Sequence, residues 1–171
     1  MPNSSDQLRL NVGFLINQSV GSSREFLFDL PVFHLDSEFH LTKLGGMAKF
    51  TRTAQGLLAQ VKMYATLETE CVRCLSNSQQ DLNIDFTELY AFSPNSVTDS
   101  ELLIPENAQI NLRPLVREYM LLDMPINPLC KADCKGLCPI CGQNLNESTC
   151  NHEDETVDPR LSILKSLLEK K

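Results

Sequence analysis

The spacing of the seven cysteines constrains this chain more than any other feature of its sequence. They fall into pairs, the last of which is completed by a histidine: Cys71 and Cys74, Cys130 and Cys134, Cys138 and Cys141, and Cys150 with His152. Zinc takes four nitrogen or sulfur ligands in a tetrahedron, and a Cys-x2-Cys turn brings two thiolates to one ion. Eight ligands complete two such sites, so we predict two structural zinc ions per chain.

Two partitions of these eight ligands are compatible with the sequence. We favour a compact site closed by one short loop, because a short loop loses little entropy on closure; its ligands are Cys138, Cys141, Cys150 and His152. The remaining cysteines then form an all-thiolate site that connects the β region to the segment after a predicted helix: Cys71, Cys74, Cys130 and Cys134. The alternative places Cys130, Cys134, Cys138 and Cys141 on one ion and leaves Cys71, Cys74, Cys150 and His152 for the other.

Other uses of the cysteines fit the sequence less well. Their odd number does not complete a disulfide framework, and the start of the chain shows no signal peptide, which favours a reducing, cytoplasmic compartment. A redox Cys-x-x-Cys pair needs a following helix in a βαβ unit, whereas Cys71 and Cys74 follow a predicted strand. Catalytic zinc needs an open coordination position, and neither HExxH nor H-x-E with P-C-x-x-C is present. We therefore expect a protein that is not an enzyme and has no small-molecule substrate.

Alternating apolar residues predict a β region in the first half of the chain. From Leu57 to Cys71 the apolar side chains fall on one parity, which indicates a long strand with one buried face. Further strands are expected at Phe26–Leu30, Phe39–Leu44, Met47–Thr53 and Leu82–Phe86, with a turn at Gln55-Gly56. We interpret Pro31 and Gly45-Gly46 as breaks between strands.

The second half of the chain has a helical pattern. Apolar residues from Leu112 to Tyr119 recur at i, i+3, i+4 and i+7, which predicts a helix with Asn111 as its N-cap and an end at Met124. A short terminal helix is expected to open at Asp158-Pro159. The fold class is therefore α+β: a twisted or barrel-like antiparallel β region, a helix, and a zinc-clamped C-terminal extension. The expected divisions are residues 1–92, a linker or loop at 93–107, and residues 108–171.

The net charge limits how this chain could bind nucleic acid. Fifteen basic and 22 acidic side chains give a formal charge of −7 at pH 7, and a chain this acidic does not follow phosphates through its net charge. The acidity is concentrated in residues 76–129, with two basic and eight acidic side chains. The cysteine-rich residues 130–171 carry six basic and seven acidic side chains, so RNA binding would need a local basic patch around the zinc loops, and a basic protein partner is the alternative. No apolar run approaches the length of a transmembrane helix, so no membrane partner is expected.

Five blocks of residues, in order and spacing, resemble the YceD-like family, the bacterial and plastid group also called large ribosomal RNA subunit accumulation proteins. The blocks are Cys71–Leu75, Leu115–Tyr119, Cys130–Pro139, Cys141–Asn146 and Asp158–Leu161. Where the family pattern has Cys-x-Cys, this chain has Cys150-Asn151-His152, and histidine is also a zinc ligand. The resemblance implies a non-enzymatic factor needed for accumulation of large-subunit ribosomal RNA, which binds that RNA, a ribosomal protein or an assembly intermediate.

Two modes of action are compatible with this resemblance. In the first, a zinc-knuckle module contacts ribosomal RNA directly through basic residues around the cysteines: Arg73, Lys131, Lys135, Arg160 and Lys165. In the second, the acidic stretch from Asp81 to Glu118 holds a basic ribosomal protein, because complementary charge speeds and orients association. A solvated surface is the alternative interpretation of both charged regions.

Overall fold

A computed structural model describes residues 7–34, 40–93 and 102–152 of the chain. Its main sheet contains β2 (Ser23–Leu30), β3 (Phe33–His34), β4 (His40–Arg52), β5 (Gly56–Glu70) and β6 (Asn77–Ala91). The strands run in the order β2-β4-β5-β6, all neighbours are antiparallel, and β3 pairs with β4. This path is open, so the described strands do not close into a barrel.

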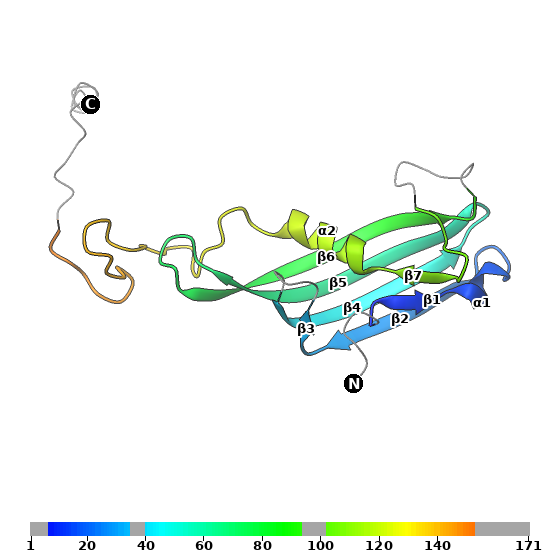
Figure 1. Cartoon of the computed structure of the whole chain (residues 1–171), viewed down its shortest axis with the longest axis horizontal. Helices are drawn as coiled ribbons and strands as arrows, with labels where there is room; N and C mark the ends of the chain where they lie inside the picture. Colours follow the sequence, from blue (N-terminus) through cyan, green and yellow to red (C-terminus); the bar gives the residue numbers. More distant parts are fainter. Residues whose placement is uncertain (1–6, 35–39, 94–101, 153–171) are drawn as a thin grey trace, which may run out of the picture.

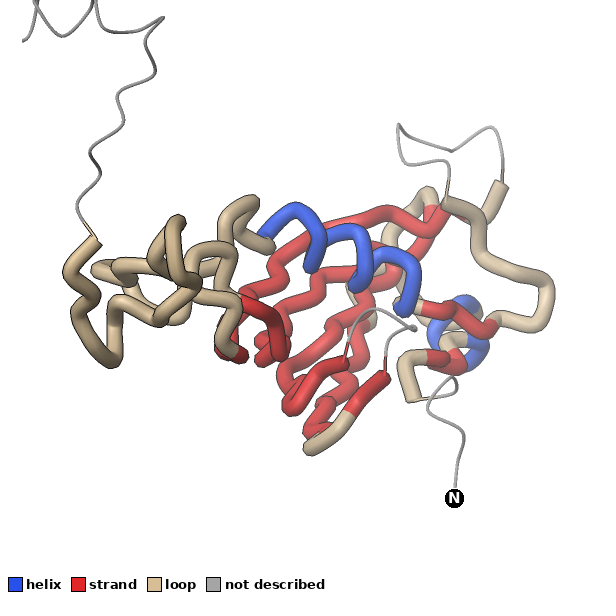
Figure 2. The backbone as a smooth tube through the Cα atoms, turned by 60° about the vertical axis from the view of Figure 1, so that its left-hand side comes forward, coloured by secondary structure: helices blue, strands red, loops and turns tan. Residues whose placement is uncertain are grey.

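Two helices and a second, two-stranded sheet complete the described part and make the fold α+β. The small sheet pairs β1 (Arg9–Asn11) with β7 (Gln109–Asn111), and the helices are α1 (Gly13–Ile16) and α2 (Arg113–Asp123). Figure 2 shows α2 lying across one face of the main sheet. No helix in the described ranges is long and apolar enough to cross a membrane.

The β5–β6 hairpin is the framework of the sheet and confirms the alternation in the sequence. Both strands have 15 residues, and the register pairs Gly56 with Ala91 and Glu70 with Asn77. The odd-numbered residues of β5 from Leu57 to Leu67 are buried, which places them on the face that α2 covers. The hairpin therefore extends well past the apolar core, and its turn holds the first cysteine pair.

Gly45 and Gly46 lie inside β4, so the predicted break between Phe39–Leu44 and Met47–Thr53 is wrong. They pair with Tyr64 and Met63 of β5. A Cβ at Gly45 would overlap the Tyr64 ring, and a Cβ at Gly46, whose φ is +139°, would overlap the Lys62 carbonyl. Glycine here permits a close approach of two backbones, which is a known role inside strands.

The β1–β7 pair was not predicted from the sequence. Arg9 pairs with Asn111, so the beginning of the chain is hydrogen bonded to the residues that precede α2. Leu8, Leu10 and Val12 are buried in the same core as the main sheet, and their spacing of two residues is the signal that could have identified β1. The pair joins the expected segments 1–92 and 108–171, whose boundaries stay a prediction.

The N-cap of helix α2 lies one residue later than predicted. Leu112 takes the N-cap position, but the Asn111 side chain still accepts the Arg113 N–H at 3.1 Å. The helix ends at Asp123, as the sequence predicts. Tyr119 stacks on Phe86 of β6 with ring centroids 4.4 Å apart, which holds the helix against the sheet. The terminal helix expected at Asp158-Pro159 lies outside the described residues.

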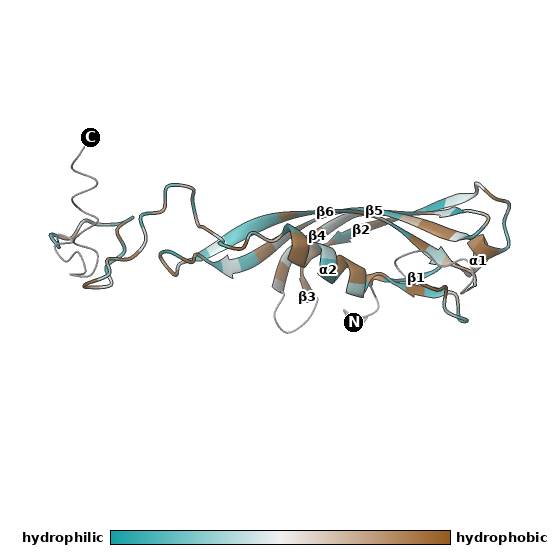
Figure 3. Cartoon of the chain, turned by 90° about the horizontal axis from the view of Figure 1, so that it is seen from above, coloured by the Kyte–Doolittle hydropathy of each residue, from teal (hydrophilic) through white to brown (hydrophobic). Residues whose placement is uncertain are grey.

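The cysteine-rich segment lies beyond one end of the sheet. After α2 the chain runs past the β5–β6 turn and continues away from the sheet (Figure 1). Coloured by hydropathy, α2 and the middle of the sheet carry many apolar residues, whereas the segment after α2 is mixed (Figure 3). The main core contains no cysteine, and Cys71, Cys74 and Cys134 form a separate small cluster with Leu129 and Leu137.

Candidate metal centres

The structure brings the eight predicted ligands together in the favoured partition. Site I consists of Cys71, Cys74, Cys130 and Cys134, and site II consists of Cys138, Cys141, Cys150 and His152. Within each site the four ligand atoms lie within 4.8 Å of one another, close enough for one metal ion to contact all four. All seven cysteines are free thiols.

Site I is built from the β5–β6 turn and the segment after α2. Cys71 follows the last residue of β5, and its N–H and carbonyl bond Ser76 and Leu75, respectively, at 2.9 Å. Leu75 has a φ of +57°, which turns the chain back into β6. The Val72 N–H donates to the Pro128 carbonyl at 3.0 Å, which brings the second cysteine pair against the first.

The four thiols of site I are arranged as two short pairs. Cys71 Sγ lies 3.8 Å from Cys134 Sγ, and Cys74 Sγ lies 3.5 Å from Cys130 Sγ. Cys71, Cys74 and Cys134 are buried, and Cys130 is the most exposed of the four. The site is therefore largely enclosed by its own loops.

Local hydrogen bonds favour thiolate formation at site I. Burial opposes ionisation of Cys71, but backbone N–H groups of Cys130, Cys74 and Arg73 lower its pKa to about 6. The Ser76 hydroxyl, 2.8 Å from Cys74 Sγ, lowers the pKa of that thiol. The pKa of Cys130 is raised to about 12 because it shares a hydrogen bond with Cys74 and is partly desolvated. A divalent cation would replace the proton that such a pair shares.

Site II is closed by the short loop that follows site I. The Cys138 N–H donates to the Gln143 carbonyl at 2.8 Å, and the Gly142 N–H donates back to the Cys138 carbonyl at 2.9 Å. Gly142 has a φ of +73°, so glycine after Cys141 permits the turn. His152 directs Nδ1 toward Cys138 Sγ at 3.9 Å.

Site II is more exposed than site I. Cys138 is buried, Cys150 is half-buried, and Cys141 and His152 are exposed. Backbone N–H groups of Cys141 and Ile140 lower the pKa of Cys138 to about 6, whereas its hydrogen bond to Cys150 raises the pKa of that thiol. Site I thus offers four sulfur donors, two of which, Cys71 and Cys74, have a lowered pKa, and site II offers three sulfur donors and one nitrogen, with a lowered pKa at Cys138.

Arg73 connects the two sites. Its carbonyl accepts the Leu137 N–H at 3.1 Å, and its guanidinium donates to the Cys134 carbonyl at 2.9 Å. Gly136, with a φ of +79°, lies against the same carbonyl. The structure therefore gives Arg73 a role in holding the loops together, in addition to its predicted contact with RNA.

The other predicted RNA-facing residues are only partly placed. Lys131 and Lys135 are exposed on the loop that contains Cys130 and Cys134. Arg160 and Lys165 lie outside the described residues. Of the predicted RNA-facing residues, the described part therefore contains Arg73, Lys131 and Lys135.

Two side chains that support site I were not singled out from the sequence. Ser76 contacts Cys74, as described above, and the Asn146 amide donates to Cys134 Sγ at 3.3 Å. Asn146 Oδ1 also accepts the Lys135 N–H at 2.9 Å, so one side chain from the site II loop anchors the site I loop. The block Cys141–Asn146 contains this residue, but nothing in its spacing indicates a contact with a thiol twelve residues earlier.

We expect Asn146→Ala to weaken metal binding at site I about tenfold, because residues that hydrogen bond metal ligands typically contribute 10- to 100-fold to affinity. Competition of the purified protein with a chromophoric zinc chelator measures the zinc affinity of site I and that of site II separately. Asn127→Ala, an exposed asparagine before Pro128, is the matched control and should leave both affinities unchanged. Equal affinities of Asn146→Ala and the control would show that the N–H···S contact has no role.

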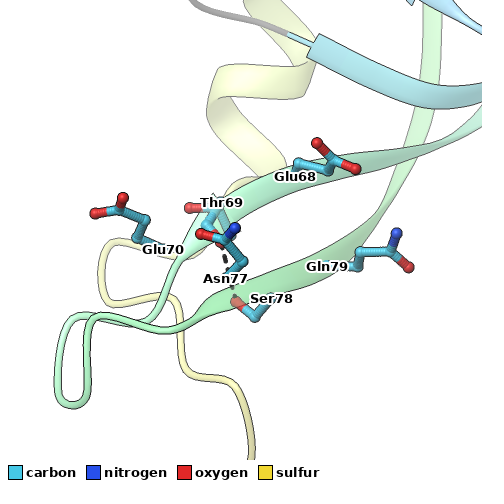
Figure 4. A pocket seen from close by; sticks show the side chains of 6 residues that line it. All are labelled: Glu68, Thr69, Glu70, Asn77, Ser78 and Gln79. Carbon is cyan, nitrogen blue, oxygen red and sulfur yellow. Dashed lines mark hydrogen bonds between the residues drawn. The ribbon is translucent and has the colours of Figure 1, made fainter.

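A polar hollow lies at the end of the β5–β6 hairpin (Figure 4). It is lined by Glu68, Thr69, Glu70, Asn77, Ser78 and Gln79. Ser78 Oγ donates to the Thr69 carbonyl at 3.4 Å. Its two carboxylates lie close to site I, and they disfavour RNA phosphates on this side of the molecule.

The fold and the two sites define an α+β protein whose sheet carries a cysteine-rich segment able to hold two metal ions. Residues 59–168 match the family model described as "Large ribosomal RNA subunit accumulation protein YceD". The chain therefore belongs to the YceD family, as its resemblance predicted.

Relatives of the chain come from bacteria and from a plant. An uncharacterized protein of Mycobacterium tuberculosis is 34% identical over 120 residues, which cover 67% of this chain and 57% of the relative. The uncharacterized protein YlbN of Bacillus subtilis is 30% identical over 100 residues, 57% of this chain and 58% of the relative. Large ribosomal RNA subunit accumulation protein YCED homolog 1, chloroplastic, of Arabidopsis thaliana is 34% identical over 65 residues, 38% of this chain and 20% of the relative.

The matched part of the chain thus spans little more than half the length of the bacterial relatives. No solved structure matches this chain.

Proposed function

We propose that sites I and II bind zinc and that the ions are structural. The observation that carries this proposal is the convergence of eight sulfur and nitrogen ligands into two sets of four. A tetrahedral site with Zn–S bonds of about 2.3 Å has sulfur atoms about 3.8 Å apart. The Sγ–Sγ distances of 3.8 and 3.5 Å in site I agree with that spacing.

Four protein ligands per ion favour a structural role. A catalytic zinc ion keeps one position for water or substrate, and both sites would be filled by side chains alone. The hydrogen bonds that favour thiolates serve metal binding itself, because zinc binds the deprotonated form. The protein is accordingly proposed to have no enzymatic activity.

We further propose that the protein is a cytoplasmic factor that supports accumulation, processing or assembly of large-subunit ribosomal RNA. Family membership supports this role, since the family model and the plant relative both carry the name of large ribosomal RNA subunit accumulation. The zinc-stabilised segment would present Lys131 and Lys135 to ribosomal RNA or to an assembly intermediate. Net charge does not favour RNA binding. Two zinc ions bound by seven thiolates add a charge of about −3, which makes the metal-bound protein more acidic than its formal charge.

A second mode of action is that of an adaptor for a basic ribosomal protein. It is supported by the acidic region 76–129, whose described part includes β6, β7 and α2. In this mode the metal sites would stabilise the end of the sheet, and the binding surface would lie on the sheet and helix.

Reversing the charge of Lys131 and Lys135 to glutamate is expected to lower the affinity for large-subunit ribosomal RNA at least about tenfold. It should also reduce the slope of log K against log salt by about 1.5, because two phosphate contacts are lost. Filter binding of the purified protein at several salt concentrations measures both quantities. The matched control reverses Lys43 and Lys49, two lysines of β4.

The same variants separate the two modes in cells. Each is expressed in a bacterium that lacks its own family member, and the ratio of large- to small-subunit ribosomal RNA is measured. A fall in this ratio with the Lys131 and Lys135 variant, but not with the Lys43 and Lys49 control, supports RNA contact. If the wild-type protein ignores ribosomal RNA at low salt yet restores the ratio, the adaptor mode replaces direct contact. Failure of the wild type to restore the ratio would contradict the proposed role itself.

A further inference from the structure

One edge of β6 faces no other strand. β6 is the last strand in the sheet order and pairs only with β5 among the described strands. The Asn83 N–H donates to the Asp123 carboxylate at 2.8 Å, and the Ala91 N–H donates to the Leu102 carbonyl at 2.9 Å. Both N–H groups therefore point away from β5, toward the same edge.

The free part of this edge lies between those two points. Alternate residues of an antiparallel strand direct their backbone groups to the same side. Asp85, Thr87 and Leu89 have the parity of Asn83 and Ala91, so they present backbone donors and acceptors along the edge. At about 3.4 Å per residue the stretch from Asn83 to Ala91 measures about 27 Å, and its free part has room for about five residues.

Beside this edge runs a groove between β6 and α2. A hollow of about 580 Å³ contains Leu115, Tyr119 and Leu122 of α2 together with Glu88 and Tyr90 of β6. A second hollow shares Tyr119 and Leu122 and continues toward Asp85 and Asp123. The two hollows thus form one groove along the same part of β6 that has the free edge.

Helix α2 places a second apolar stripe in this groove. Its first stripe, with Val116 and Met120, is buried in the core. The second stripe, Leu115, Tyr119 and Leu122, lines the groove, and Leu122 is 79% exposed. An isolated exposed leucine needs no explanation, but a stripe beside an unpaired strand edge is typical of a surface that receives another chain.

The charge of the groove specifies what kind of chain fits. Glu88 and Glu118 line the first hollow, and Asp85 and Asp123 line the second. Neither hollow contains a lysine or arginine among its described lining residues. Lys62 of the neighbouring strand pairs with Asp85 at 3.1 Å. Glu88 accepts the Tyr119 hydroxyl at 3.0 Å and Asp123 accepts the Asn83 N–H at 2.8 Å, but both donors are uncharged, so these two carboxylates keep their negative charge in the groove. A basic segment is therefore complementary in charge.

We infer that this groove binds an extended basic segment of a partner protein, which adds as a short strand to the free edge of β6. Backbone hydrogen bonds to Asp85, Thr87 and Leu89 would provide affinity, alternate apolar side chains would pack on the α2 stripe, and the basic side chains between them would meet the acids. This inference deepens the adaptor mode of the proposed function by naming its surface and the chemistry of its partner, and it requires neither zinc nor RNA contact. A second copy of the chain is a poorer fit, because its other edge strand, β2, carries Glu25 and Asp29 against Arg24.

The test uses the full-length, zinc-loaded protein and a fluorescent nonapeptide in which lysine and valine alternate. Fluorescence anisotropy at low salt should show saturable binding, and the double variant Glu118→Lys with Leu122→Ser should weaken it at least about tenfold. The matched control, Glu25→Lys with Leu27→Ser, changes equally exposed residue types on β2 and should bind the peptide normally. In the wild type, hydrogen exchange measured by NMR should slow at the Thr87 and Leu89 amides when the peptide is added.

Each contrary outcome is distinct. Absence of saturable binding up to about 1 mM peptide would overturn the inference. Equal binding by the groove variant and the β2 variant, or protection of amides elsewhere, would show that the peptide uses another surface. A peptide-free dimer that protects Thr87 and Leu89 would identify a second copy as the occupant. Zinc content and ribosomal RNA binding of the groove variant are measured in parallel and should be unchanged, so failure here is separable from failure of the proposed RNA contact.

Discussion

A Cys134→Ser variant is expected to bind about one zinc ion per chain, whereas the wild type binds about two. Cys134 is buried, its Sγ accepts the Asn146 amide, and its carbonyl accepts the Arg73 guanidinium, so it lies at the centre of site I. Four-ligand structural zinc sites bind with about 10–16 kcal/mol, or about 3 kcal/mol per ligand. A neutral serine hydroxyl in its place should lower the affinity of site I at least about 100-fold. Elemental analysis after gel filtration measures the stoichiometry.

Cys150→Ser is the matched control, because it removes a thiol from the more exposed site II. It should also lose about one ion per chain. Hydrogen exchange in the Cys71–Ser76 turn should stay as slow as in the wild type in Cys150→Ser and should become faster in Cys134→Ser. Chelation should likewise unfold the residues after Pro128 and leave the sheet, whose core contains no cysteine. A wild-type protein with less than one zinc ion and seven accessible thiols would contradict the assignment of both sites.

The parts that the sequence predicts well are those that depend on short-range pattern. Alternation from Leu57 to Cys71 indicates a half-buried strand because side chains alternate faces, and β5 matches it within one residue. The favoured ligand partition follows from the low entropy loss of a short loop, and the structure has the same grouping. The strand and site II need only the chain near each residue, whereas site I, which joins Cys71 to Cys134 across 63 residues, follows only as the set of ligands that remains.

The parts that the sequence does not predict depend on distant contacts. The alternation of Leu8, Leu10 and Val12 indicates a short strand, but it does not reveal the partner β7, which lies about a hundred residues later. Asn146 gains its role only when the site II loop folds back on Cys134. From the sequence, Gly46 indicates a break between strands, because only the paired backbone of β5 shows why glycine is needed at that position.

Gly46→Ala is expected to lower the free energy of unfolding by about 3 kcal/mol. A φ of +139° is unfavourable for alanine by about 1–2 kcal/mol, and its Cβ would overlap the Lys62 carbonyl oxygen and approach Met63 Cα. Relief of that overlap requires β4 and β5 to separate, and overpacking of this kind adds about 1–3 kcal/mol. For a chain of this size the loss corresponds to a fall in Tm of about 6–12 °C, which circular dichroism measures.

Gly21→Ala separates the two contributions to this loss. Gly21 also has a positive φ, +94°, but nothing lies within 4 Å of the Cβ that alanine would add. The control should therefore lose only the 1–2 kcal/mol or so of backbone strain. If both variants lose the same stability, contact between β4 and β5 is not what requires glycine at position 46. Zinc content should stay near two ions in both variants, because sites I and II lie beyond the end of the sheet and are held by their own loops.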